Sequence, residues 1–231
     1  MRKELFLPHT QIVDKKRAIV SYCEGKNVLD VGMGGHIDNS KKNEEYFQQD
    51  LDQTLHGQIS KVAKSLDGLD INELAIQAAS SVYKGQYFIG DLTDETLYQT
   101  IGKQYDVIVL GDVIEHLDQH RPALMNLKQL LKPDGILIIT TVNAYCIDAI
   151  LKMAFRYESV HEEHTCYFSY ITMQRLLTMN GYQIEGFQYY RNQRKKFGSV
   201  LHRLGVAIKN ATTCFFPQYE MGLLFVARAV N

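Results

Sequence analysis

Short apolar runs alternate with longer amphipathic segments along the first two thirds of the chain, and this alternation constrains the fold most. The runs cover residues 27–31, 66–71, 86–89, 106–110 and 135–142. Strands that are apolar on both faces are typical of parallel sheets covered by helices on both sides. Helical segments are expected between them, over about 43–64, 72–82, 94–101 and 121–131. Right-handed crossovers between such units predict a doubly wound α/β sheet.

The pattern changes after residue 142. A helix is expected over 169–180, with Gly181 as its stop, followed by two closing strands over 182–190 and 221–230 that are antiparallel to each other. These two strands bring the predicted sheet to seven. A length of 231 residues with 45% apolar residues suits one domain over 1–231. We expect a capping helix within 1–24 (over 10–23), a ligand-binding core over 25–145 and acceptor-side elements over 146–231.

Charge and cysteine content exclude several classes of protein. With 25 basic against 26 acidic residues, the chain has no global electrostatic signature of nucleic-acid binding. The four cysteines, which form no C-x-x-C pair, favour reduced thiols over a disulfide framework; they are Cys23, Cys146, Cys166 and Cys214. The chain shows neither the apolar core of a signal peptide nor a run of about 18 apolar residues. The prediction is a cytoplasmic protein without a transmembrane segment.

Four successive apolar runs end in an aspartate: Asp30, Asp70, Asp91 and Asp112. A single aspartate in this position is often only a helix N-cap. In a doubly wound sheet, however, the carboxyl ends of the strands form the ligand-binding edge. Four carboxylates at that edge therefore predict a binding site.

A glycine-rich turn follows Asp30 and contains Gly32, Gly34 and Gly35. A dinucleotide fingerprint, G-x-G-x-x-G, fails here because its third glycine would fall on Ile37. The phosphate loop G-x-x-x-x-G-K-[ST] is also absent from the sequence. Carboxylates without a pyrophosphate cradle favour a cationic nucleoside as the ligand.

Five motifs in order resemble class I S-adenosylmethionine-dependent methyltransferases. They read VLDVGMGG (28–35), GLDINELAI (68–76), GDLTD (90–94), YDVIVLGDVIEHL (105–117) and LLKPDGILIITTVN (130–143). The later stretch HEEHTCYFSYITMQRLLTMNGYQIEGF (161–187) is similar to the ubiquinone-type O-methyltransferase branch. The resemblance implies a Rossmann-like methyltransferase fold, S-adenosylmethionine as cofactor and a small-molecule acceptor.

The resemblance also implies roles for the residues that match the motifs. The loop under the amino-acid part of the cofactor holds Asp30, Gly32, Gly34 and Gly35; the ribose contacts Asp70 and Ile71; the adenine contacts Asp91 and Leu92; the methionine end contacts Asp112. His36 replaces the third glycine of the family's D-x-G-x-G-x-G motif. The spacing from Asp30 to Asp70 is 40 residues, about twice that of the family, which leaves Asp50 or Asp52 as alternative ribose acids.

Three histidines are candidates for deprotonating a hydroxyl acceptor, because imidazole titrates near neutral pH. They are His116, His161 and His164. His116 could instead be a histidine hydrogen-bonded to backbone at a helix start, and the other two could equally be exposed loop residues. The main prediction includes no metal. An alternative set, Asp112, Glu115, His116 and His164, resembles the metal ligands of small-RNA 3′-terminal 2′-O-methyltransferases.

A basic segment over 191–209 contains six cationic residues and no acidic one: Arg191, Arg194, Lys195, Lys196, Arg203 and Lys209. It could contact RNA phosphates or a membrane surface, or form a solvated charged face. The sequence thus predicts a methyltransferase acting on a small-molecule hydroxyl. The alternatives are a metal-dependent RNA ribose methyltransferase and a non-catalytic S-adenosylmethionine-binding module. The oligomeric state is left open.

Overall fold

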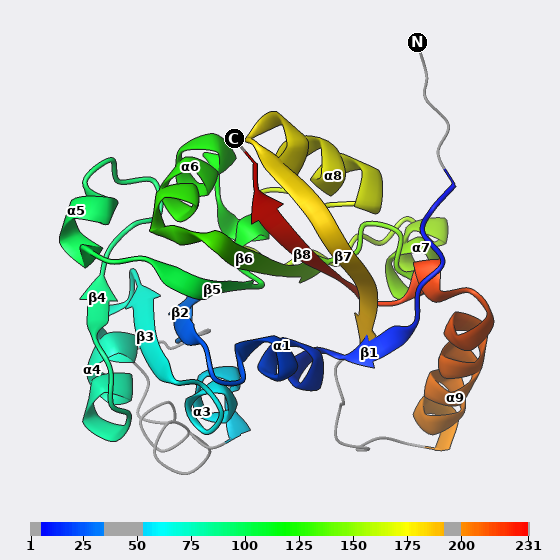
Figure 1. Ribbon diagram of the computed structural model, residues 1–231. Helices are drawn as coiled ribbons and strands as arrows, with labels where there is room; N and C mark the ends of the chain where they lie inside the picture. The colour runs from blue at the N-terminus through cyan, green and yellow to red at the C-terminus, as the bar shows by residue number, and fades with distance from the viewer. Residues whose placement is uncertain (1–5, 35–52, 192–199, 231) are drawn as a thin grey trace.

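The computed structural model describes residues 6–34, 53–191 and 200–230. Its centre is one eight-stranded sheet with helices on both faces (Figure 1). The strands are β1 (Ile12–Asp14), β2 (Asn27–Val31), β3 (Ser65–Asp70), β4 (Tyr87–Ile89), β5 (Tyr105–Gly111), β6 (Leu131–Val142), β7 (Tyr182–Arg191) and β8 (Gly222–Ala229). Their order is β1-β7-β8-β6-β5-β2-β3-β4, and only β8 is antiparallel to its neighbours.

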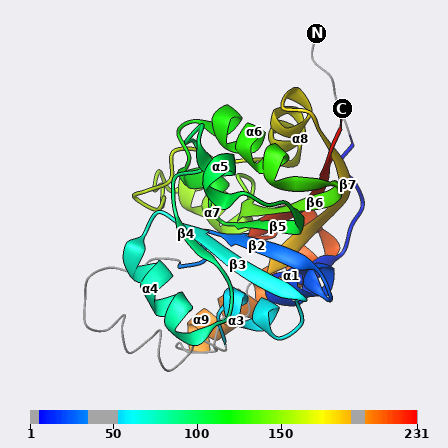
Figure 2. The ribbon, with the colours of Figure 1, turned by 60° about the vertical axis from the view of Figure 1, so that its left-hand side comes forward.

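The described helices include two layers that cover the faces of the sheet. They are α1 (Lys15–Cys23), α3 (Leu55–Ser60), α4 (Glu73–Val82), α5 (Leu97–Ile101), η2 (Ile114–His116), α6 (His120–Leu130), α7 (Ile147–Ala154), α8 (Tyr170–Met179), α9 (Val200–Phe215) and η3 (Pro217–Tyr219). Both views show α5, α6 and α8 on one side of the sheet and α1, α3 and α4 on the other (Figures 1 and 2). Along β5, Ile108 packs in the core of the first layer and Val109 in the core of the second. This alternation confirms the doubly wound sheet.

The prediction of seven strands was wrong by one, because Ile12–Asp14 forms β1 instead of the start of a helix over 10–23. Ile12 pairs with Tyr189 and Val13 with Tyr190, in parallel. This pairing covers the edge of β7, whose backbone groups would otherwise lack partners on that side. Asp14 then caps α1 by accepting a hydrogen bond from the Arg17 N–H (3.0 Å), so the helix begins only at Lys15.

Other boundaries differ less. The helix expected over 169–180 is α8, which Ser169 begins with a capping box to Thr172. Strand β6 begins at Leu131, four residues before the predicted 135, and α7 was not predicted. The helix expected over 43–64 is described only from residue 53, where α3 covers Leu55–Ser60. Within the described parts of the chain, no helix has the length and apolarity to cross a bilayer.

Candidate active site

The carboxyl ends of β2, β3, β4 and β5 lie at one edge of the sheet, and the strand order reverses between β2 and β5. The chain runs outward from β2 to β3 and β4 and then returns to β5 on the other side of β2. Such a switch point opens a crevice outside the strand ends. The predicted carboxylates lie at or just beyond these ends: Asp30, Asp70, Asp91 and Asp112. The structure therefore brings all four aspartates to one edge.

The turn after β2 requires glycine at position 32. Gly32 has φ +71°, and a Cβ there would lie 2.3 Å from Cγ2 of Val113. Any side chain would thus meet both backbone strain and a clash. The Gly32 N–H donates to the Leu69 carbonyl (2.9 Å), which ties the turn to β3. Gly35 and His36, which the sequence analysis placed in the same loop, lie outside the described residues.

Asp70 ends β3 and holds the same glycine turn. Its Oδ2 accepts a hydrogen bond from the Gly34 N–H, and its Oδ1 accepts one from the Asn72 N–H (2.9 Å each). A carboxylate has about four acceptor positions, so each oxygen retains capacity for a further donor. Asp70 can therefore still accept two hydroxyl groups. The alternative ribose acids, Asp50 and Asp52, lie outside the described residues.

The other residues expected beside the adenine and the ribose differ in exposure. Asp91 is exposed, and its Oδ1 accepts hydrogen bonds from the backbone N–H and the hydroxyl of Thr93 (2.8 Å each). Leu92 is buried in the hydrophobic core, whereas Ile71 is 75% exposed. Ile71 and Asp91 therefore present side chains to solvent near the edge, while only the backbone of Leu92 is available there.

Asp112 follows β5 and is the most heavily bonded of the four carboxylates. Lys15 forms an ion pair with its Oδ2, while the hydroxyls of Thr140 (2.8 Å) and Tyr190 (2.9 Å) donate to its Oδ1. Burial alone would raise the pKa of Asp112, but the Lys15 ammonium and these hydrogen bonds hold that pKa below its usual range. Asp112 is thus ionised and adjacent to a cation.

Sequence reasoning missed Lys15. Because β1 is parallel to β7, which is parallel to β6, its carboxyl end lies at the same edge as those of β2 and β5. Lys15 directly follows β1 and is therefore delivered to this edge. No local signal could reveal this, since the placement depends on pairing between segments about 177 residues apart in sequence.

A second missed residue is His56, which binds the aspartate of the first motif. Asp30 is buried, and its Oδ2 lies 3.0 Å from His56 Nδ1. His56 Nε2 lies 3.0 Å from the Tyr87 hydroxyl. Burial and the neighbouring Tyr83, Asp67 and Asp30 raise the pKa of Tyr87, so its hydroxyl keeps its proton. His56 lies on α3, within the long Asp30–Asp70 spacing noted in the sequence, and its contact holds the Asp30 carboxylate in place.

The three predicted histidines converge. The ring centroid of His116, at the end of η2, lies 4.7 Å from that of His164 and 5.9 Å from that of His161. The His161 and His164 centroids are 5.3 Å apart. In addition, His116 Nδ1 lies 3.8 Å from a carboxylate oxygen of Glu163. We call His116, His161 and His164 the histidine cluster.

The loop that carries His161 and His164 is held against η2 by Thr165. Its N–H donates to the Glu115 carbonyl (2.9 Å), and its hydroxyl donates to the Leu117 carbonyl (2.8 Å). The loop ends in a bridge between Phe168 and Asn143, directly after β6. These contacts explain how residues 45 or more positions apart meet in the histidine cluster.

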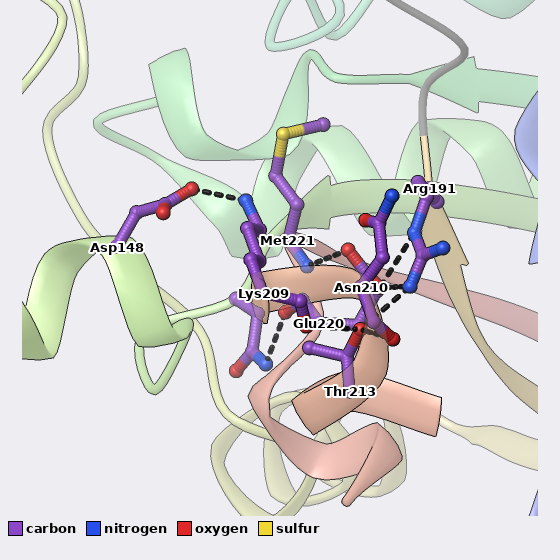
Figure 3. Close-up of polar contacts among 8 residues, drawn as sticks. Asp148, Arg191, Lys209, Asn210, Thr213, Glu220 and Met221 are labelled. Atoms are coloured by element: carbon purple, nitrogen blue, oxygen red, sulfur yellow. Dashed lines mark hydrogen bonds and ion pairs between the residues drawn. The ribbon is translucent and has the colours of Figure 1, made fainter. Parts of the chain in front are cut away.

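The basic segment is partly neutralised within the protein (Figure 3). Arg191 donates through Nε and Nη2 to Glu220 (2.9 and 2.6 Å), and Lys209 pairs with Asp148. The Thr213 hydroxyl accepts a further bond from Arg191 (2.6 Å). Two of the six cations thus have internal partners, which weakens the prediction of phosphate or membrane contacts. Arg194, Lys195, Lys196 and the Arg203 side chain lie outside what the structure describes.

Comparison with known proteins identifies the family of this chain and the cofactor of the site at the strand ends. The family described as "Methyltransferase domain" matches residues 11–185, which is more than half of the chain. The chain belongs to this family. It is a class I S-adenosylmethionine-dependent methyltransferase, and its cofactor is S-adenosylmethionine. The resemblance seen in the sequence is therefore confirmed.

Curated relatives include the ubiquinone-type branch. The mitochondrial ubiquinone biosynthesis O-methyltransferase of Schizosaccharomyces pombe is 26% identical over 135 residues, which cover 55% of this chain and 42% of that protein. The aligned part of the methyltransferase thus spans less than half the length of this relative. The fold is shared with a Haloferax volcanii methyltransferase solved with the Trm112 activator (TM-score 0.60, 14% identity, 93% of this chain, 88% of that one). An Archaeoglobus fulgidus SAM-dependent methyltransferase has a TM-score of 0.54 (16% identity, 93% and 91%).

The residues at the edge fit this cofactor. Because Gly32 has no side chain, the turn presents backbone atoms at the edge. Each oxygen of the Asp70 carboxylate can accept one further hydrogen bond, so Asp70 can bind two hydroxyl groups. Asp112 and Lys15 present opposite charges side by side, which matches the ammonium and carboxylate of an amino acid. A nucleoside joined to an amino acid is thus complementary to the edge from β3 to β5.

Proposed function

We propose that this methyltransferase transfers a methyl group to the hydroxyl of a small molecule, with histidine-assisted deprotonation. The observation that carries the proposal is the histidine cluster, which lies on η2 and the loop over 161–168, immediately after Asp112 and the cofactor edge. The name of the Schizosaccharomyces pombe relative, an O-methyltransferase, supports oxygen as the acceptor atom.

Each residue of the edge receives a role in this proposal. S-adenosylmethionine supplies an electrophilic methyl group when bound. Asp70 would accept hydrogen bonds from both ribose hydroxyls and Asp91 one from the adenine amine, with Ile71 and Leu92 beside them. The backbone of Gly32, Gly34 and Gly35 would line the amino-acid end. Asp112 would attract its ammonium and Lys15 its carboxylate, while Asp30 supports the turn through His56.

The proton of the acceptor would pass to Nε2 of His116. Its Nδ1 faces the Glu163 carboxylate at 3.8 Å, and a carboxylate favours a protonated nitrogen. The acceptor hydroxyl would then donate its proton to Nε2. His161 and His164 border the same position and would orient the acceptor. Alignment of the hydroxyl with the methyl group would supply much of the rate.

We also propose that residues 1–231 act as one methyltransferase domain, since one sheet takes strands from Ile12 to Ala229. The four free cysteines support action in the reducing cytoplasm. The RNA alternative has less support than before, because Arg191 and Lys209 are bound internally.

Calorimetry with S-adenosylmethionine tests the cofactor assignments. Two aspartates make the same turn: Asp91 with Thr93, and Asp94 with Thr96 (2.8 Å contacts in both). Asp91→Asn and Asp70→Asn should weaken binding by roughly 10-fold to 100-fold, since hydrogen bonds to charged groups are worth about 1.5–3 kcal/mol. Asp94→Asn is the matched control and should bind like the wild type. Equal weakening by all three variants would contradict the assignments.

A screen of phenols and sugar alcohols with a labelled methyl donor tests the reaction. His116→Ala should lower kcat by roughly 100-fold or more, the usual contribution of a general base, with cofactor affinity unchanged. Cofactor binding without transfer to any acceptor would favour the non-catalytic module. With RNA added to the same screen, transfer to RNA alone would favour the ribose methyltransferase.

A further inference from the structure

We propose that the histidine cluster binds one divalent transition-metal ion, of the class of Zn²⁺ or Co²⁺. His116, His161 and His164 each offer one ring nitrogen, and these three atoms lie within 4.8 Å of one another. Imidazole is a preferred ligand of such ions, and three protein ligands with one open position are typical of catalytic zinc sites.

Small movements would complete the coordination. A metal–nitrogen bond of about 2.1 Å places two ligand nitrogens of a tetrahedral ion about 3.4 Å apart. Since the three nitrogens lie within 4.8 Å of one another, they need to approach by at most about 1.4 Å. His161 is exposed and carried by a loop, so rotation of its ring can supply this movement and also admit the ion.

The surroundings of the histidine cluster fit a metal site. The Glu163 carboxylate lies 3.8 Å from His116 Nδ1, from where a small movement would let it hydrogen-bond and orient a ligating imidazole. The loop and η2 are joined through Thr165, whose hydrogen bonds limit how far His164 and His116 can separate. The ligands thus come from two segments that the fold already holds together.

The donor set differs from the one expected by resemblance. In that set Asp112 would be a ligand, but its carboxylate is bound by Lys15, Thr140 and Tyr190. Three imidazoles select transition metals, whereas Mg²⁺ and Ca²⁺ prefer oxygen ligands. The inference is therefore a nitrogen site at the histidine cluster instead of an oxygen-rich site at Asp112.

Metal binding does not rest on the proposed function, because it requires neither cofactor nor acceptor. If the ion is bound during methyl transfer to a hydroxyl, the acceptor oxygen can occupy its open position, which lowers the pKa of the hydroxyl so that its proton leaves to water instead of to His116. His116 would then act through the ion and not as a free base. Activity with and without a chelator separates these two uses of the cluster.

The test is a titration of the untagged, chelator-treated protein with Co²⁺ followed by visible spectroscopy, and with Zn²⁺ by calorimetry. We expect one ion per chain and the intense d–d bands of four-coordinate Co²⁺. His161→Ala and His164→Ala should each weaken binding by more than the roughly 10-fold to 100-fold that loss of an outer-shell partner costs. His9→Ala, which removes an exposed histidine outside the cluster, is the matched control.

Three outcomes would overturn the proposal: no saturable binding, binding that both variants retain, or Mg²⁺ binding that is lost in Asp112→Asn but not in His161→Ala. Calorimetry with S-adenosylmethionine on the same variants verifies that they are folded. Normal cofactor binding together with absent metal binding would refute only this inference. Normal metal and cofactor binding without methyl transfer to any hydroxyl acceptor would refute only the proposed function.

Discussion

Two glutamates, Glu115 and Glu220, are both completely buried, but their surroundings are opposite. Glu220 receives two hydrogen bonds from the Arg191 guanidinium and one from the Met221 N–H (3.1 Å) (Figure 3). Neither carboxyl oxygen of Glu115 accepts a hydrogen bond of standard geometry among the described residues, although the Thr141 hydroxyl lies close enough to lower its pKa. Burial, followed by repulsion from Asp112, raises the pKa of Glu115 to about 7.

This difference in hydrogen bonding distinguishes Glu220, which has a structural role, from Glu115, which lies beside the candidate active site. A buried charge costs several kcal/mol unless it is paired, and Arg191 supplies the partner for Glu220 where β7 ends and β8 begins. Glu115 lies between Asp112 and His116 in the sequence, and the nearby Lys15 lowers its pKa by less than burial and Asp112 raise it. Uncompensated buried polar groups are tolerated mainly where function requires them.

The largest expected effect comes from breaking the compensated pair. Arg191→Leu leaves the Glu220 carboxylate buried without a counter-ion, so the free energy of unfolding should fall by about 3 kcal/mol, the lower end of the range for buried pairs. The lower end applies because the Arg191 side chain is 30% exposed. Urea denaturation measures this change. The double variant Arg191→Leu/Glu220→Leu has no uncompensated charge, so most of the lost free energy of unfolding should be regained. A double variant as unstable as the single one would contradict this account.

The second prediction concerns the uncompensated glutamate. Because the pKa of Glu115 rises from 4.5 unfolded to about 7 folded, its contribution to stability is fully present below about pH 4.5. That contribution is lost as the pH rises through 7. Glu115→Gln cannot ionise, so we expect it to be more stable than the wild type at pH 8.5, by on the order of 2 kcal/mol, and nearly equal to it at pH 5.

Urea denaturation of both proteins across this pH range, in the presence of a chelator, measures the effect. Glu220→Gln is the comparison, because it removes a charge that the protein does compensate. That variant should be less stable than the wild type at pH 8.5, the opposite sign to Glu115→Gln. If both variants changed the free energy of unfolding at pH 8.5 in the same direction, the proposed difference between the two glutamates would be wrong.

The smallest effect is expected at the outer pair of the same network. Lys209 pairs with Asp148, whose side chain is 51% exposed (Figure 3). Ion pairs open to solvent contribute at most about 1 kcal/mol. Lys209→Met should therefore change the free energy of unfolding by less than about 1 kcal/mol, and salt should reduce even that difference. A loss as large as that of Arg191→Leu would show that burial does not decide the strength of these pairs.

Sequence patterns predicted most of the fold and the strand-end carboxylates because both depend on local order. An apolar run followed by Asp and Gly describes a strand and its turn, and parallel strands must place those turns on one edge. The same reasoning failed at Ile12–Asp14. The sequence pattern predicted one helix over 10–23, but these three residues form a strand. Pairing with Tyr189 and Tyr190 outweighed that local preference.

The chain by itself thus determined the doubly wound sheet, the acidic edge and the membership of the methyltransferase family. Only the tertiary structure decided which charges meet: Lys15 with Asp112, His56 with Asp30, and the three histidines with one another. The physical reason is that hydrophobic periodicity is a property of neighbouring residues, whereas electrostatic partners are chosen by distances in space. Those distances exist only after strands from both ends of the chain have joined one sheet.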